Sequence, residues 1–229
     1  MNQEYNLRLT KIREQLVHDK VDACLLSTSV NILYANGSIF SGYYFIPVEG
    51  EPSLFVKRPV GLKGENIHYI RKPEQIPEFL TKMGIKKPAR LMLEGDEMGH
   101  SEWLRLQACF SESELVNGTT ALRTVRSIKT DYEVSLIRAS ASAHVNAYKR
   151  IPEIYRPGMT DMSFAIEIEY IMRHEGNQGL FRTFGDMDAF MGSVLAGDNA
   201  EVASPYDFAL GGAGTVFNPI GAAGHLLKS

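Results

Sequence analysis

Few residues of this chain have the types and the spacing that chemistry at a protein site requires. The six histidines show neither an H-x-E-x-H nor an H-x-x-x-H spacing, so no two of them would face one metal ion from the same helix. Asp186 and Asp188 form a D-x-D pair in a predicted loop, without a third carboxylate at a suitable spacing. A solvated loop is the simpler interpretation of that pair. His144 beside an apolar helix stripe is better explained as a hydrogen-bonded core histidine, so the sequence predicts no metal site.

Two glycine-rich segments could in principle approach a ligand. Residues 192–197 have the glycine spacing that opens a P-loop, but Asp198 and Asn199 follow where Lys and Ser or Thr are needed. The cation and the hydroxyl that bind phosphate and Mg²⁺ are therefore missing, and we predict no nucleotide site. Residues 211–214 (GGAG) would allow a close backbone approach to a ligand, and a flexible connection explains them as well.

The composition is that of an ordinary globular protein, with 44% hydrophobic and 22% charged residues over 229 positions. The net charge of -3 and the pI near 6.1 disfavour nucleic acid or an anionic membrane as a partner. The N-terminus lacks the apolar core of a secretory signal, and no run approaches the roughly 18 apolar residues of a membrane span. We therefore expect a cytoplasmic protein, in which Cys24 and Cys109 are two buried thiols rather than a disulfide.

The first half of the chain alternates between strand-like and helix-like patterns. Apolar residues at helical spacing predict an opening helix over residues 3–18. Short apolar runs bounded by turn residues predict strands at 21–27, 43–48, 53–56, 66–70 and 90–93. Helical patterns lie between them at 73–83 and 101–110. This alternation predicts an α/β domain, with a mixed sheet and flanking helices, that ends near Arg126.

A second domain is predicted to begin with two long helices. Thr130 and Glu133 form a capping box, in which each side chain can bond the other residue's backbone amide, and a long helix should follow. Its apolar stripe contains Val134, Ile137, Ala141, Val145 and Tyr148, and residues 155–158 (YRPG) break it. Thr160 caps a second helix that runs to about His174, and a strand-like run follows at 189–195. We therefore predict domains at 1–126 and 127–229.

Several segments resemble, in the right order, a known family. Residues 29–56 (SVNILYANGSIFSGYYFIPVEGEPSLFV) look like the creatinase-type N-terminal domain, where a short helix precedes a glycine turn and a hairpin. Residues 123–138 (RTVRSIKTDYEVSLIR) are similar to the segment that joins this domain to the pita-bread catalytic domain of prolidase, aminopeptidase P and creatinase. Residues 156–161 (RPGMTD) and 192–199 (GSVLAGDN) match further family segments. The resemblance implies an incomplete α+β pita-bread domain after the first domain.

The resemblance also implies where the metal ligands of such an enzyme would lie. In the family, a segment like residues 225–229 (HLLKS) precedes two Asp ligands, a His and two Glu, so we expect all five beyond Ser229. Such a ligand set suits two divalent ions of Mn, Co or Zn, which lower the pKa of a bridging water. The 229 residues alone are therefore expected to bind no metal cofactor and to lack hydrolytic activity.

One departure from the family pattern concerns a substrate-binding histidine. Many relatives have a Pro-His pair near this point, whereas this chain has Pro205 followed by Tyr206 and Asp207. A phenol donates one hydrogen bond but does not shuttle protons near neutral pH as imidazole does. This weakens a creatinase-type reaction and leaves metal-dependent peptide hydrolysis less affected. Tyr206 and Asp207 are candidate substrate-binding residues, and an ordinary capped turn is the competing interpretation.

Two hypotheses follow for the function. In the first, the chain is the N-terminal portion of a metal-dependent peptidase, of aminopeptidase P or prolidase type, that acts on peptides with proline at the second position. The resemblance implies a homodimer for such a protein. In the second, the chain is a non-catalytic binding or dimerisation module with a creatinase-like fold. An open sheet in that module would need a partner to cover its exposed edges and apolar surface.

Overall fold

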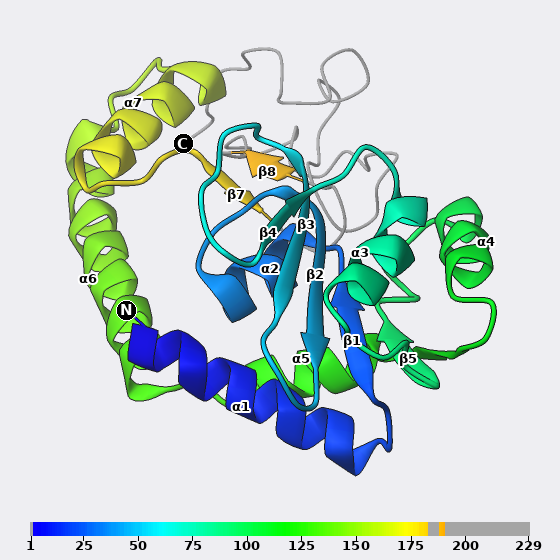
Figure 1. Ribbon diagram of the computed structural model, residues 1–229. Coiled ribbons are helices and arrows are strands. Elements are labelled where there is room, and N and C mark those ends of the chain that lie inside the picture. Colours follow the sequence, from blue (N-terminus) through cyan, green and yellow to red (C-terminus); the bar gives the residue numbers. More distant parts are fainter. Residues whose placement is uncertain (1, 183–187, 191–229) are drawn as a thin grey trace. The chain divides into compact units, whose positions relative to one another are not determined.

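The computed structural model describes residues 2–182 and 188–190, which fall into two compact units (Figure 1). The first unit contains the described residues up to Lys129, and the second begins at Thr130. None of the helices in the described ranges combines the length and the apolar character that crossing a membrane would need. Both cysteines belong to the first unit as free thiols, Cys24 buried and Cys109 half-buried.

The first unit is built on a six-stranded mixed sheet with the strand order β4-β3-β2-β1-β5-β6. The strands are β1 (Ala23–Leu26), β2 (Ser41–Pro47), β3 (Ser53–Arg58), β4 (Ile67–Tyr69), β5 (Arg90–Leu93) and β6 (Glu114–Asn117). Only β2 runs against its neighbours, because β1 and β3 both pair with it antiparallel while the remaining pairs are parallel. The carboxyl ends of the other five strands therefore lie along one edge of the sheet.

Helices cover both faces of this sheet, as predicted from the alternating pattern. The helices of the unit are α1 (Asn2–His18), α2 (Ser29–Asn36), α3 (Ile76–Lys82), α4 (His100–Cys109) and α5 (Thr119–Ser127), with a short 3₁₀ turn, η1 (Pro73–Gln75), before α3. Cys24 and Leu26 belong to the core that includes residues of α1, α2 and α5, while Ala23 and Leu25 belong to the core that includes residues of α3 and α4. Successive side chains of a strand point to opposite faces, so β1 contributes to both cores.

Local sequence signals set the ends of α2 and fix α1 beside it. The Thr28 side chain accepts the Asn31 amide as an N-cap, and Gly37 ends the helix at φ +78°. A Cβ at Gly37 would lie 2.2 Å from the Tyr5 ring of α1, so a larger residue would displace that ring and would also be strained at this φ. Arg8 lies over the rings of Tyr5 and Tyr34 and donates to the Tyr34 carbonyl at 3.1 Å. This side chain is buried and joins α1 to α2.

The sequence patterns missed two elements of the first unit. β6 is a four-residue edge strand with polar ends, and its side chains are at most half-buried, which leaves no apolar run to find. α5 follows it at once, and its only buried residues are Thr119 and Leu122. Short amphipathic elements of this kind gain their stability from packing rather than from local propensity.

The second unit begins with the predicted helix pair, α6 (Asp131–Ile154) and α7 (Asp161–His174), and contains the paired strands β7 (Leu180–Arg182) and β8 (Asp188–Phe190). The capping box is present, since the Thr130 side chain accepts the Glu133 amide at 3.2 Å while that carboxylate accepts the Thr130 amide at 2.9 Å. Thr160 caps α7 through one such bond, because its side chain accepts the Ser163 amide. Both predicted helix starts are confirmed.

The predicted apolar stripe of α6 is not its buried face. Ile137, Val145 and Tyr148 are 54%, 50% and 62% exposed, whereas Ala147 is the buried residue of this helix. The two helices face each other along the small side chains of α6, which line a hollow with Met172 of α7. His144 also lines that hollow but is exposed, with its Nδ1 2.9 Å from the Ser140 carbonyl. The expectation of a core histidine was therefore wrong, although the hydrogen bond is present.

His68 on β4 generates a prediction about the pH dependence of stability. Its ring lies 5.6 Å from the ring of Phe55 and 5.3 Å from that of Phe79, and its buried Nε2 has no hydrogen-bond partner among the described residues. Burial lowers the pKa of His68 below its usual value, because the charged imidazolium loses hydration. The folded protein then binds fewer protons than the unfolded chain, so this contribution to stability is present above pH 6.5 and is lost as the pH falls below it.

We expect His68→Phe to reduce the loss of folding free energy between pH 7 and pH 5, measured by urea unfolding at each pH. His100→Gln changes an exposed histidine of α4 and should leave the loss unchanged. Equal pH dependence in the wild type and His68→Phe would contradict this account of His68.

Candidate functional site

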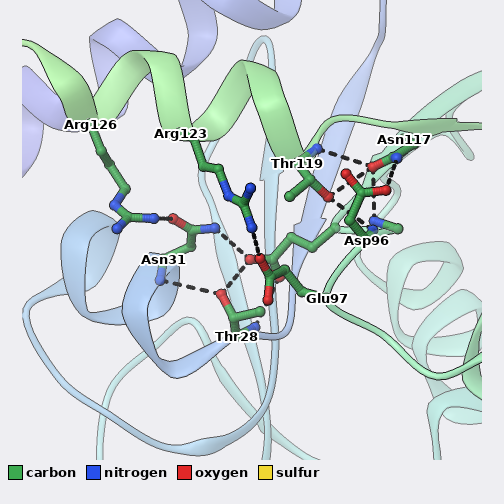
Figure 2. Close-up of polar contacts among 10 residues, drawn as sticks. Thr28, Asn31, Asp96, Glu97, Asn117, Thr119, Arg123 and Arg126 are labelled. Atoms are coloured by element: carbon green, nitrogen blue, oxygen red, sulfur yellow. Dashed lines mark hydrogen bonds and ion pairs between the residues drawn. The ribbon is translucent and has the colours of Figure 1, made fainter. Parts of the chain in front are cut away.

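A dense polar network lies at the carboxyl ends of the parallel strands β1, β5 and β6 (Figure 2). Ligands of open α/β sheets bind outside these strand ends, so this edge is where a site is expected. The network draws side chains from the loops after β1 and β5, from the end of β6, and from α2 and α5. Its chemistry depends on whether any of its groups is left open for a ligand.

Glu94 lies at the centre of the network, directly after β5, and its side chain is completely buried. Its Oε2 accepts the backbone amides of Ser27 at 2.5 Å and Thr28 at 2.9 Å, together with the Ser27 hydroxyl at 3.2 Å. Its Oε1 accepts the Thr28 hydroxyl and the Asn31 side-chain amide, the latter at 2.5 Å. Five donors therefore surround one carboxylate, which is the usual way that a buried charge is stabilised.

The network continues from Glu94 to α5 through one amide side chain. The Asn31 Oδ1 accepts from the Arg126 guanidinium at 2.8 Å, while the Asn31 amide nitrogen donates to Glu94 (Figure 2). Burial lowers the pKa of Arg126, and the nearby Glu94 charge opposes that shift. Glu94 acts in the other direction on the buried Cys24 thiol, whose pKa is raised by burial first and by this carboxylate second. The buried Cys24 is therefore an unreactive core residue, because its reactive thiolate form is disfavoured.

A second cluster joins β6 to the loop after β5. The Asn117 Oδ1 accepts the amides of Gly95 at 3.0 Å and Thr119 at 3.1 Å, and the Asn117 amide donates to Asp96 at 2.7 Å (Figure 2). The Thr119 hydroxyl in turn accepts the backbone amide of Asp96 at 3.1 Å. Gly118 lies between the two polar residues, and a Cβ there would be 2.1 Å from Cγ of Met92. The close approach of these loops therefore depends on glycine at that position.

The carboxylates of this edge are all engaged by protein groups. Glu97 pairs with the Arg123 guanidinium of α5 and Asp96 with Asn117 (Figure 2), and Glu94 accepts from its five donors. Glu94 has donors on both oxygens and therefore no open position from which to accept a proton or to coordinate an ion, whereas Asp96 and Glu97 are each bound through one oxygen. Within residues 2–182 and 188–190, no cluster of His, Cys, Asp and Glu could hold a metal ion. The network therefore binds loops and helices to strand ends.

Most of the sequence-predicted site residues lie outside the part of the chain that the structure describes. Tyr206 and Asp207, the candidate substrate-binding pair, lie outside the described residues, as do the glycine-rich segments 192–197 and 211–214. Asp188 is the first residue of β8, and Asp186 is not described. The substrate-binding role of Tyr206 and Asp207 thus stays a prediction.

Sequence reasoning missed Glu94, although a signal for it was present. An acidic residue directly after the apolar run of β5 (RLML) would be left at the edge of a buried sheet, where a charge needs partners. The Thr and Asn residues that follow β1 are the partners it finds. Their distance of more than sixty positions from Glu94 hid the pairing from local patterns.

The fold is therefore that of an α/β domain with a mixed sheet, in which side-chain hydrogen bonds connect the ends of β1, β5 and β6. Residues 8–128 match the family model described as the Creatinase/Prolidase N-terminal domain. The chain belongs to this family, because the match covers more than half of its length. The prediction of the family and of the mixed α/β fold is confirmed.

Known proteins with similar sequences or folds extend the likeness beyond this domain. An uncharacterized peptidase of Bacillus subtilis, YqhT, is 25% identical over 180 residues, which cover 74% of this chain and 50% of that protein. The structure resembles a Xaa-Pro dipeptidase from Bacillus anthracis with a TM-score of 0.62 at 19% identity, over 76% of this chain and 50% of the other. It also resembles an X-Pro aminopeptidase from Thermotoga maritima with a TM-score of 0.63 at 17% identity, over 81% and 58%. The chain thus spans about half the length of these proteins.

Substitution of Glu94 tests whether the network stabilises the fold. Glu94→Gln keeps the shape but turns one acceptor oxygen into a donor that faces other donors, so we expect it to lower the free energy of unfolding by about 2–4 kcal/mol. Glu112→Gln removes an exposed carboxylate, 3.9 Å from Lys87, and should change that free energy by less than about 0.5 kcal/mol. Urea unfolding monitored by circular dichroism measures both. Equal free energies of unfolding for the two variants would show that Glu94 does not stabilise the fold.

Proposed function

We propose that these 229 residues are the N-terminal portion of a metal-dependent peptidase that acts on Xaa-Pro peptides. The observation that supports this most strongly is the family match over residues 8–128. The likeness to solved structures covers 76% and 81% of the chain, which is more than the family domain alone. The proteins concerned are named a Xaa-Pro dipeptidase and an X-Pro aminopeptidase.

In this proposal the first unit supports the enzyme and does not perform its chemistry. The carboxylates at its strand ends are bound to protein donors, and residues 2–182 and 188–190 offer no ligand set for a pair of Mn, Co or Zn ions. This part of the chain therefore gives no geometry for a metal-dependent step. When bound elsewhere in the enzyme, such ions would activate water for attack on the peptide bond that precedes proline.

Three further features belong to the proposal. Tyr206 and Asp207 are proposed to line the substrate pocket, and the two domains are proposed to divide near Arg126. The enzyme is proposed to act as a homodimer in the cytoplasm. Its substrate class is a peptide with proline at the second position, whose tertiary amide has no N–H to donate. Recognition therefore has to use the shape of the proline ring.

A non-catalytic binding or dimerisation module is the second candidate function. The exposed apolar side chains of the second unit favour it, because Ile137, Val145 and Tyr148 on α6 and Ile166 and Tyr170 on α7 are each at least half exposed. An apolar surface of this kind commonly marks a contact with another protein surface. In the peptidase proposal the same residues would be covered by other parts of the enzyme.

Hydrolysis assays separate the two functions. We expect the purified 229-residue chain to release no product from an Xaa-Pro dipeptide or an Xaa-Pro-Xaa tripeptide with added Mn²⁺ or Co²⁺. The native protein isolated from its own cells should cleave one of them, lose activity with a chelator, and leave an Ala-Ala control peptide intact. Its intact mass, measured on the same sample, shows whether it exceeds the 25.5 kDa of this chain.

Metal-dependent cleavage by the 229-residue chain itself would overturn the proposed inactivity. A native protein of 25.5 kDa without Xaa-Pro activity would instead support the binding module.

A further inference from the structure

A hollow of about 720 Å³ opens in the first unit beside the ends of β3 and β4. Lys57 and Arg58 line it from the end of β3, and Tyr69, Ile70 and Arg71 line it from β4 and the residues that follow. Gln75 of η1 and Val60 of the loop after β3 complete it. The hollow thus occupies the same carboxyl edge of the sheet as the Glu94 network, but at its other end.

We propose that this hollow is a binding site for a small organic anion, with a carboxylate or phosphate group bound by Arg58 and Arg71. Three of its seven lining residues are cationic, and none is acidic. The charge of the lining is therefore uncompensated, although the whole chain has a net charge of -3. Guanidinium groups suit such ligands because their planar donors match two oxygens of a carboxylate or phosphate.

The two arginines have no partners within the part of the chain that the structure describes. Neither the Arg58 nor the Arg71 guanidinium takes part in a hydrogen bond or an ion pair there. The nearby carboxylate of Glu74 is bound by Arg105 through two contacts of 2.6 and 2.9 Å. Hydrogen bonding to Arg105 is also the main cause that lowers the pKa of Glu74, so this group stays committed to that pair.

Lys57 packs against the ring of Tyr43, which does not line the hollow. Its ammonium lies 4.6 Å from the centroid of the Tyr43 ring and 3.4 Å from the Tyr43 hydroxyl. That hydroxyl donates to Glu102 at 2.7 Å. Lys57 is therefore held against Tyr43, and it adds positive charge beside the hollow rather than a direct contact to the anion.

Gln75 adds neutral donors in a fixed orientation. Its Oε1 accepts the backbone amides of Arg71 at 2.7 Å and Lys72 at 3.2 Å. Because these two bonds hold the oxygen toward the backbone, the amide nitrogen is directed away from it. Among the described residues nothing accepts a hydrogen bond from that nitrogen, so its two N–H groups are available to an anion.

The remaining walls determine what kind of anion fits. The Tyr69 hydroxyl accepts the Gly61 amide at 2.8 Å and donates to the Leu62 carbonyl at 3.0 Å, which fixes the loop that carries Val60. The ring of Tyr69, with Val60 and Ile70, presents apolar surface beside the cations. A hollow of this volume is within the range of small-molecule sites. The walls therefore suit an anion with an apolar or aromatic body over a bare inorganic ion.

This site does not depend on the proposed peptidase function, because none of its residues belongs to the predicted substrate pair. Isothermal titration of the 229-residue chain with phenyl phosphate, benzoate and inorganic phosphate tests it, at constant ionic strength in a buffer without oxyanions. We expect saturable binding of phenyl phosphate or benzoate at about 1 mM or tighter. The stronger of the two identifies a phosphate or a carboxylate as the preferred group, and inorganic phosphate alone should bind more weakly.

Variants then locate the binding. Arg58→Gln and Arg71→Gln should each weaken it by about tenfold or more, since each removes a charge-assisted contact. Lys63→Gln changes a cation of the same loop that does not line the hollow, and it should leave the affinity within about twofold. The side-chain amide signals of Gln75 in the nitrogen-correlated NMR spectrum of the wild type should shift with phenyl phosphate, whether or not the variants fold.

Three results would overturn the proposal. The first is the absence of saturable binding by both organic anions. The second is an affinity that falls equally in Lys63→Gln, which would indicate a general charge effect. The third is binding that leaves the Gln75 signals unmoved.

Discussion

The buried carboxylate of Glu94 constrains the arrangement of the whole first unit. A charge with no exposed surface is tolerated only where donors replace its lost hydration, and the cost of leaving it unpaired is several kcal/mol. Its donors come from the turn after β1, from the first residues of α2 and, through Asn31, from α5. The position of α2 over the sheet, the start of that helix and the packing of α5 are thus linked to one side chain. Arg8 extends the linkage, because it joins α1 to α2.

The same edge of the sheet shows two kinds of polar chemistry. At β1, β5 and β6 the carboxylates of Asp96 and Glu97 are bound by protein donors (Figure 2), and the buried Glu94 is bound through both of its oxygens. At β3 and β4 the cations line an open hollow in which two guanidinium groups have no partner among the described residues. The antiparallel strand β2 separates the two regions. One end of the edge thus holds loops and helices of the unit in place, and the other end carries the proposed anion site.

The sequence was sufficient for those elements whose signals are local. The helix starts at Thr130 and Thr160 were predicted because a cap and its partner amide are three residues apart. The strands with continuous apolar runs, such as β1 and β5, were predicted for a similar reason. β6 and α5 were missed because their stability comes from packing, and Glu94 was missed because its partners are more than sixty residues away. Periodicity showed that α6 has an apolar stripe, and His144 beside it was expected to lie in a core. The stripe is exposed, because periodicity identifies an apolar face without identifying what packs on it.

If Glu94 fixes the turn after β1, that turn should be as stable toward local opening as the sheet itself. Native-state hydrogen exchange of the Ser27 and Thr28 amides, which both donate to Glu94, measures this. If the carboxylate is the tie described above, both amides should exchange with the same free energy as the β1 amides of Cys24 and Leu25. Exchange of Ser27 and Thr28 through local opening, at a much lower free energy than the strand amides, would contradict it.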